Sequence, residues 1–91
     1  MSKRIVLSTL ASQNIGEISK FIEEDSSFRA KKFILEIKKK IFDLILFPKL
    51  GKQIDNERYI YLIHKNYFII YKIEKDIIYV ISVKNVKNKV K

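Results

Sequence analysis

The chain has 91 residues, which is short enough that we expect a single domain spanning residues 1–91. Hydrophobic residues make up 47% of it and it has two glycines and one proline, which excludes disordered and low-complexity proteins. It has no cysteine for disulfides or thiolate metal sites, and no apolar run long enough to cross a bilayer, so we expect a cytoplasmic protein without membrane partners.

The charge is strongly basic. Nineteen Lys and Arg against ten Asp and Glu give a formal net charge of +9. Such a field attracts polyanions, which can be nucleic acid, an acidic protein partner or an anionic membrane surface. The alternative is that an AT-rich genome, which favours lysine codons, accounts for part of the excess.

The N-terminal segment predicts a strand followed by a helix. Residues 3–8 alternate so that Ile5 and Leu7 share one face. Ser8 is a residue type that caps helices, since its hydroxyl accepts a backbone N–H of the first turn. Helical spacing then places four apolar residues in one stripe: Ala11, Ile15, Ile18 and Ile22.

The second helix has the clearest pattern in the chain. Residues 23–27 end the first helix and provide a cap for the second. Phe47 stands before Pro48 and therefore avoids the helical region, which ends the element. The short connection predicts an antiparallel hairpin. One apolar sector contains Ala30, Phe33, Ile34, Ile37, Ile41, Leu44 and Ile45.

After Gly51 the hydrophobic period changes from about 3.6 to 2. Three β-branched and aromatic runs, at residues 58–64, 67–73 and 77–83, are separated by short gaps typical of hairpins. We expect the tail of residues 84–91 to be partly frayed. The predicted fold is α+β: an N-terminal strand, a two-helix antiparallel hairpin, then a three-stranded antiparallel meander, with the helices on one face of a small antiparallel sheet.

This order of elements, and the residues at their boundaries, resemble the RelE/ParE superfamily of toxins from type II toxin–antitoxin pairs. The resemblance covers almost the whole chain and implies the RelE/ParE-like fold. In the third strand it includes the tyrosine- and isoleucine-rich run at residues 66–73. The other matching positions are Ala11, Asn14 (where the family usually has Asp), Ile15, Ile18, Phe21, Ile22, Ala30, Leu44, Pro48, Gly51, Lys52, Arg58, Ile81, Ser82 and Val83.

The superfamily implies one of two activities, ribosome-dependent mRNA cleavage or inhibition of DNA gyrase. Cleavage through the RNA 2′-hydroxyl needs a proton acceptor, cations for the phosphate and a donor for the leaving oxygen. RelE-like enzymes supply these with Lys and Arg on strands two and three, where this chain has Tyr59, Tyr61 and Phe68. Residues 84–91 also lack Arg, His and Tyr. We therefore favour a ParE-like, non-enzymatic gyrase inhibitor that uses no cofactor, metal or small-molecule substrate.

Basic side chains are the candidate target-binding residues, and the alternative is that they are ordinary solvated surface charges.

Two other functions remain open. The second hypothesis is a ribosome-dependent endoribonuclease acting on mRNA, and the third is an inactive relative kept as a binding module. His64 has the only side chain whose ordinary pKa is near neutrality, although a solvated strand-end histidine is the simpler interpretation. Target binding is assigned to Lys49, Lys52, Arg58, Lys84 and Lys87, and the alternative catalytic set is Lys52, Arg58, His64 and Lys87.

The five tyrosines, Tyr59, Tyr61, Tyr67, Tyr71 and Tyr79, are expected to be core residues with solvated hydroxyl groups rather than platforms for bases.

A cognate antitoxin is implied in either active case. It should carry an acidic or amphipathic segment that wraps the helices or adds to a sheet edge. A second apolar stripe on the long helix consists of Phe28, Leu35, Phe42 and Leu46. We expect most of this stripe to pack on the first helix, with antitoxin contact along its edge at Leu35, Phe42 and Leu46.

Overall fold

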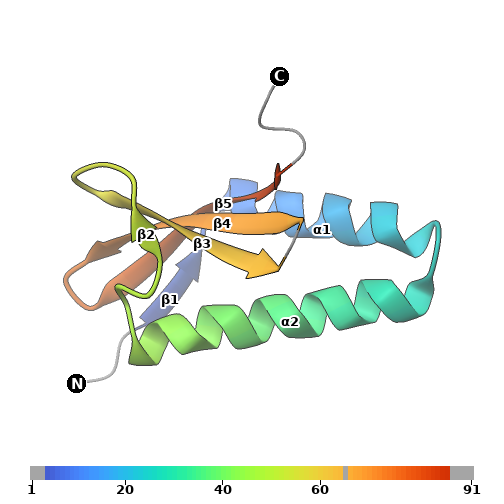
Figure 1. Ribbon diagram of the computed structural model, residues 1–91, viewed down its shortest axis with the longest axis horizontal. Helices are drawn as coiled ribbons and strands as arrows, with labels where there is room; N and C mark the ends of the chain where they lie inside the picture. The colour runs from blue at the N-terminus through green and yellow to red at the C-terminus, as the bar shows by residue number, and fades with distance from the viewer. Residues whose placement is uncertain (1–3, 65, 87–91) are drawn as a thin grey trace.

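The structure is a computed structural model that describes residues 4–64 and 66–86, without the side chain of His64. Within these residues, two helices and five strands follow one another in the order that Figure 1 shows. They are β1 (Arg4–Leu7), α1 (Thr9–Glu23), α2 (Ser27–Leu46), β2 (Lys52–Gln53), β3 (Arg58–His64), β4 (Tyr67–Glu74) and β5 (Ile77–Asn85). The predicted α+β class, with a strand, a helical hairpin and a meander, is confirmed.

Serine caps begin both helices, as predicted. The Ser8 hydroxyl accepts the backbone N–H of Ala11 at 2.9 Å and donates to the carbonyl of Ile81 at 2.6 Å. The same side chain therefore starts α1 and fastens it to β5. Ser26 accepts the N–H of Arg29 at 3.1 Å at the start of α2, which ends at Leu46, before the proline.

The sheet has the strand order β1-β5-β4-β3-β2. Strands β3, β4 and β5 form the predicted antiparallel meander. The expectation that the sheet would be antiparallel throughout was wrong, because β1 pairs in parallel with β5. The alternating pattern of a strand is the same in both directions, and the long helical connection permits parallel pairing.

Strand β2 was not predicted. It consists of two residues that pair with Tyr59 and Ile60 of β3. A strand of this length has no hydrophobic period to detect.

The core lies between the helices and one face of the sheet, with α2 running beneath the strands in Figure 1. The buried residues of this core are Ala11, Phe33, Ile37, Leu44, Ile63, Tyr67, Ile69, Tyr71, Ile78, Val80 and Val83. Tyr59 and Tyr61 pack against it from the same face, so four of the five tyrosines belong to the core as predicted, whereas Tyr79 lies on the opposite face of the sheet. The expectation of solvated hydroxyl groups was wrong for Tyr71, whose hydroxyl is buried and hydrogen-bonded. No helix in the described part of the chain is long and apolar enough to cross a membrane.

The second apolar stripe of α2 does not pack on α1, so that expectation was wrong. Phe28, Leu35, Phe42 and Leu46 are between 59% and 74% exposed. At 3.6 residues per turn the stripe is centred about 140° round the helix from the core sector. Because α1 lies beside α2 on the same face of the sheet, it does not reach that side.

Candidate functional site

The face of the sheet opposite the helices carries most of the described cations that were predicted to bind a target. We call it the open face. Its side chains alternate with those of the core and follow the strand register. Adjacent strands contribute Lys52, Ile60, Ile70 and Ser82 to one row, Leu62, Phe68 and Lys84 to a second, and Arg58, Lys72 and Tyr79 to a third.

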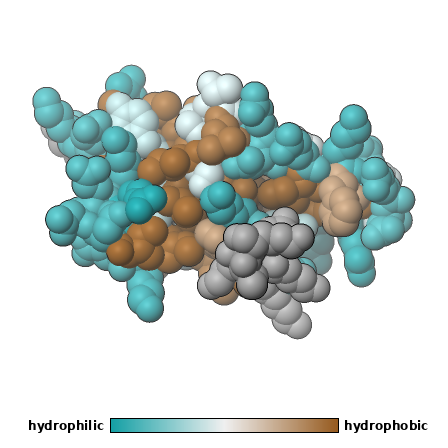
Figure 2. Space-filling view, turned by 90° about the horizontal axis from the view of Figure 1, so that it is seen from above, coloured by the Kyte–Doolittle hydropathy of each residue, from teal (hydrophilic) through white to brown (hydrophobic). Residues whose placement is uncertain are grey.

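Apolar side chains occupy the middle of this face. Ile60, Leu62 and Phe68 line a pocket of about 440 Å³, together with Leu50, Gly51, Lys52, Tyr61 and Val86. Seen from the side away from α2, the molecule shows hydrophobic surface in the middle with hydrophilic side chains around it (Figure 2). An apolar centre with a charged rim is the usual composition of a protein-binding surface.

Two free lysines stand on opposite sides of the apolar centre. Lys52 lies on β2 beside Ile60, and Lys84 lies on β5 in the row of Phe68. Both are exposed, and neither forms an ion pair with a carboxylate within residues 4–64 and 66–86. Three strand spacings separate them, which together with their offset along the strands corresponds to roughly 15 Å.

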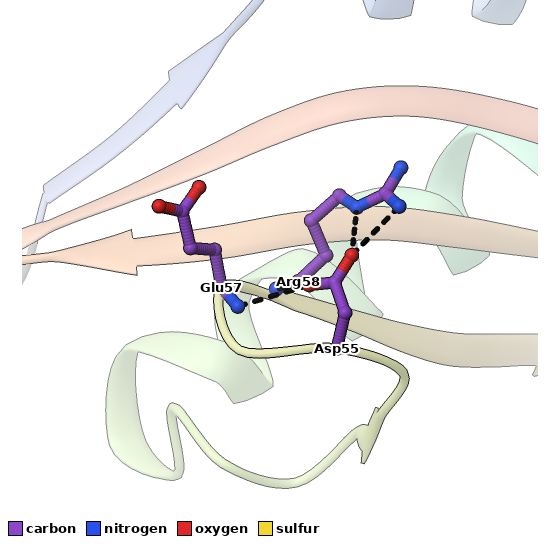
Figure 3. Close-up of polar contacts among 3 residues, drawn as sticks. All are labelled: Asp55, Glu57 and Arg58. Carbon is purple, nitrogen blue, oxygen red and sulfur yellow. Dashed lines mark hydrogen bonds and ion pairs between the residues drawn. The ribbon is translucent and has the colours of Figure 1, made fainter.

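Arg58 is held by Asp55 in the turn between β2 and β3 (Figure 3). One carboxylate oxygen, Oδ2, accepts from the Arg58 Nε and pairs with its terminal nitrogen, both at 2.7 Å. The other, Oδ1, accepts the backbone N–H groups of Glu57 and Arg58 at 2.9 and 2.8 Å. These bonds lower the pKa of Asp55 to about 2, and the bond from the Arg58 side chain has the largest effect. The guanidinium is thus already paired at neutral pH.

Lys49 does not line the pocket of the open face. It lies in the loop after α2 and lines a different pocket of about 330 Å³, with Asn56, Glu57, Tyr59, Lys72, Ile73 and Glu74. Two carboxylates share this pocket, so the local charge differs from that around Lys52. The side chain of His64 and all of Lys87, the remaining candidates, lie outside the described residues.

Tyr71 positions the loop that presents Lys49 and Lys52, a role that the sequence reasoning missed. Its buried hydroxyl donates to the carbonyl of Pro48 at 2.8 Å and accepts the N–H of Gly51 at 2.9 Å. Burial raises the pKa of Tyr71 above its ordinary value of 10.0. A Cβ on Gly51 would lie 2.7 Å from the Ile60 carbonyl and 2.9 Å from the Tyr71 hydroxyl, so only glycine fits. The proline-to-glycine spacing in the sequence was the available signal.

Asn14, which stands where the superfamily usually has Asp, also has a structural role. Its side-chain oxygen accepts the backbone N–H of Val83 at 3.0 Å and joins α1 to β5. Both an amide oxygen and a carboxylate oxygen can accept a hydrogen bond, so Asn at this position still makes the contact.

Among the side chains that the structure describes, the titratable groups with shifted pKa values do not include a base poised near neutrality. Burial raises the pKa values of Tyr67 and Tyr71, and that of Asp55 is lowered. All three shifts move away from neutral pH, whereas a general base requires a pKa close to it. No group of three or more metal-ligating side chains occurs among the residues that the structure describes.

A second apolar surface runs along α2. The exposed stripe of Phe28, Leu35, Phe42 and Leu46 ends at a pocket of about 530 Å³ lined by Leu46, Phe47, Pro48, Lys49, Leu50 and Ile73. Leu50 also lines the pocket of the open face, so the two surfaces meet at this residue.

A comparison with protein families gives a match over residues 5–89. The family is described as the ParE toxin of the type II toxin-antitoxin system, parDE. No curated protein matches this chain. The match covers nearly all of the sequence and confirms the resemblance to RelE/ParE toxins, and a type II family of this kind implies a cognate antitoxin as partner. The chain therefore belongs to the ParE toxin family of type II toxin–antitoxin systems.

Proposed function

We propose that residues 1–91 form a single ParE-like toxin domain that inhibits DNA gyrase by protein–protein binding and is neutralised by its cognate antitoxin. The observation that carries the proposal is the family match over residues 5–89. The open face supports it, because an apolar centre between two free lysines is suited to an acidic protein surface. We assign target binding to Lys52 and Lys84 on this face, with Lys49 and Lys87 as further cations.

Arg58 fits this function better than it fits nuclease chemistry. A guanidinium that stabilises a developing phosphate charge must be available to the phosphate. Here it is bound to the Asp55 carboxylate at 2.7 Å, so binding a phosphate instead would break that ion pair. In a binding surface the same ion pair fixes the β2–β3 turn, and Arg58 contributes by holding the neighbouring strand in place.

The exposed stripe on α2 is the proposed antitoxin surface. Leu35, Phe42 and Leu46 are exposed at helical spacing on the side of α2 away from the core. An amphipathic antitoxin segment would bury these side chains, as helix-in-groove partners do. Each large side chain removed from water contributes roughly 1.5–3 kcal/mol of hydrophobic free energy before the costs of association.

The test compares the two activities of the superfamily in one preparation. Purified toxin is added to gyrase and relaxed plasmid, and in parallel to ribosomes translating a defined mRNA. We expect loss of supercoiling with intact mRNA, and restored supercoiling when the antitoxin is added first. Codon-positioned mRNA cuts with undisturbed supercoiling would establish the endoribonuclease instead. No effect in either assay would identify an inactive binding module.

A further inference from the structure

The side of α2 that points away from the core has a simple composition. At 3.6 residues per turn, the positions within about 65° of the centre of the exposed stripe are the four apolar residues of the stripe and four lysines. All of these side chains are exposed. We call this surface the outer face of α2.

The lysines stand in two rows, about 50° to either side of the stripe. The rows are Lys31 with Lys38 and Lys32 with Lys39. None of these four lysines forms an ion pair with a carboxylate in the described part of the chain. The two carboxylates of α2, Glu36 and Asp43, are half-buried and lie about 85° round the helix from the stripe. The outer face therefore combines an apolar centre with positive charge along both sides.

The outer face is long and convex. From Phe28 to Leu46 it extends over roughly 27 Å at 1.5 Å per residue. Helix α2 forms the lower boundary of the molecule in Figure 1, and no other described element covers that side of it. A partner must therefore contact a ridge with lysines on both of its sides along the whole helix.

An anionic bilayer matches this surface in both chemistry and shape. Nucleic acid would neutralise the lysines, but its phosphates offer no apolar contact to the stripe. A second copy of the chain would set the lysine rows against identical rows, which repel each other. A bilayer offers apolar chains to the stripe and anionic headgroups to both rows at once. Lysines beside a Phe- and Leu-containing stripe are typical of helices that lie in a membrane interface.

We propose that the outer face of α2 binds the surface of an anionic lipid bilayer when the toxin is free of antitoxin, with the helix parallel to the membrane. The stripe enters the boundary between headgroups and acyl chains, and the lysines extend outward to the lipid phosphates. Binding of this kind needs no segment that crosses the bilayer. The inference goes beyond gyrase inhibition and does not depend on it.

The orientation of the bound toxin follows from the fold. The helices and the open face lie on opposite sides of the sheet, so the membrane-bound toxin keeps Lys52 and Lys84 in solvent. The antitoxin is assigned to the same stripe on α2, so the bilayer and the antitoxin exclude each other. Membrane binding is therefore a property of the free toxin.

The first test measures sedimentation of the purified full-length toxin with lipid vesicles. One set of vesicles is phosphatidylcholine, and the other contains equal parts of phosphatidylcholine and phosphatidylglycerol. We expect about tenfold or more tighter binding to the mixed vesicles, because each lysine near an anionic surface contributes roughly fivefold in affinity. Salt at about 1 M, where the Debye length is about 3 Å, should remove most of this difference. Equal binding to both sets, or binding to neither, would overturn the proposal.

A matched pair of substitutions identifies the face that binds. Leu35→Asp lies on the outer face and Leu62→Asp on the open face; the two leucines are 66% and 55% exposed, and each change lowers the net charge by one. Affinity for the mixed vesicles should fall about tenfold or more for Leu35→Asp and stay within about threefold of wild type for Leu62→Asp. Circular dichroism checks that both variants are folded. Equal losses, or a larger loss for Leu62→Asp, would contradict the assignment to α2.

The cognate antitoxin separates this proposal from the others. The toxin–antitoxin complex should not sediment with the mixed vesicles, and a complex that binds them as well as free toxin does would refute the restriction to free toxin. If Leu35→Asp weakens antitoxin binding but not vesicle binding, the stripe belongs to the antitoxin alone and the lipid proposal is wrong. Vesicle binding by a toxin that leaves gyrase active would refute only the gyrase proposal, and gyrase inhibition without vesicle binding only this one.

Discussion

Replacing Tyr71 by phenylalanine removes one oxygen atom and two hydrogen bonds. The hydroxyl is buried, donates to the Pro48 carbonyl and accepts the Gly51 N–H, and so joins β4 to the loop after α2. Each such bond contributes roughly 1 kcal/mol net, so we expect the free energy of unfolding to fall by about 2 kcal/mol. For a small domain with a urea m-value of about 1 kcal/mol/M, the unfolding midpoint falls by about 2 M.

The matched control is Tyr79→Phe on the open face. Tyr79 lies under the Lys72 ammonium at 5.6 Å, a contact that phenylalanine retains. Urea unfolding followed by circular dichroism should show a loss within about 0.5 kcal/mol for this variant. If Tyr71→Phe were equally mild, the Tyr71 hydroxyl would not be holding the loop, and the reasoning about Gly51 would fail with it.

The pH dependence of the same pair of proteins gives a second measurement. Burial raises the pKa of Tyr71 from 10.0 in the folded state, because the neutral hydroxyl is favoured there. The stability that it contributes is fully present below pH 10.0 and is lost as the pH rises through the raised value. The free energies of unfolding of wild type and Tyr71→Phe should therefore differ most near neutral pH and converge at strongly alkaline pH.

Three further predictions concern the turns and the α2 stripe. Gly51→Ala should unfold at lower temperature than wild type because its Cβ meets the Ile60 carbonyl at 2.7 Å, whereas Gly16→Ala, with open space in α1, should add roughly 0.5–1 kcal/mol. NMR titration should give an Asp55 pKa of about 2, and Arg58→Ala should move this pKa toward 3.8. The stability that the ionised Asp55 contributes is present above pH 3.8 and is lost as the pH falls through about 2. Leu35→Ser should change stability by less than about 0.5 kcal/mol while weakening antitoxin binding, since the side chain is exposed.

The elements that the sequence predicted well have a long hydrophobic period or a local cap. The apolar sector of α2 includes Phe33, Ile37 and Leu44, all buried as expected. The caps Ser8 and Ser26 follow from short-range hydrogen bonding alone. The direction of β1 and the existence of β2 depend on which strands meet in space, and two residues or an alternating pattern contain no such information.

The candidate site was predictable in its residue types but not in its pairing. The sequence indicated a basic target-binding set of Lys49, Lys52, Arg58, Lys84 and Lys87, and the structure places Lys52, Arg58 and Lys84 on the open face. The ion pair with Asp55 depends on the turn geometry, in which the carboxylate also accepts two backbone N–H groups. The position of the α2 stripe followed from helical geometry, but only the placement of α1 showed that the stripe remains exposed.

The most direct test of the open face as the target-binding surface is a supercoiling assay with paired charge reversals. Lys52→Glu combined with Lys84→Glu changes the net charge by four on the open face, and Lys20→Glu combined with Lys38→Glu makes the same change on the helices. If the open face binds gyrase, the first variant should require about tenfold or more protein for half-inhibition, and the second should stay within about threefold of wild type. Equal inhibition by both variants would contradict this assignment.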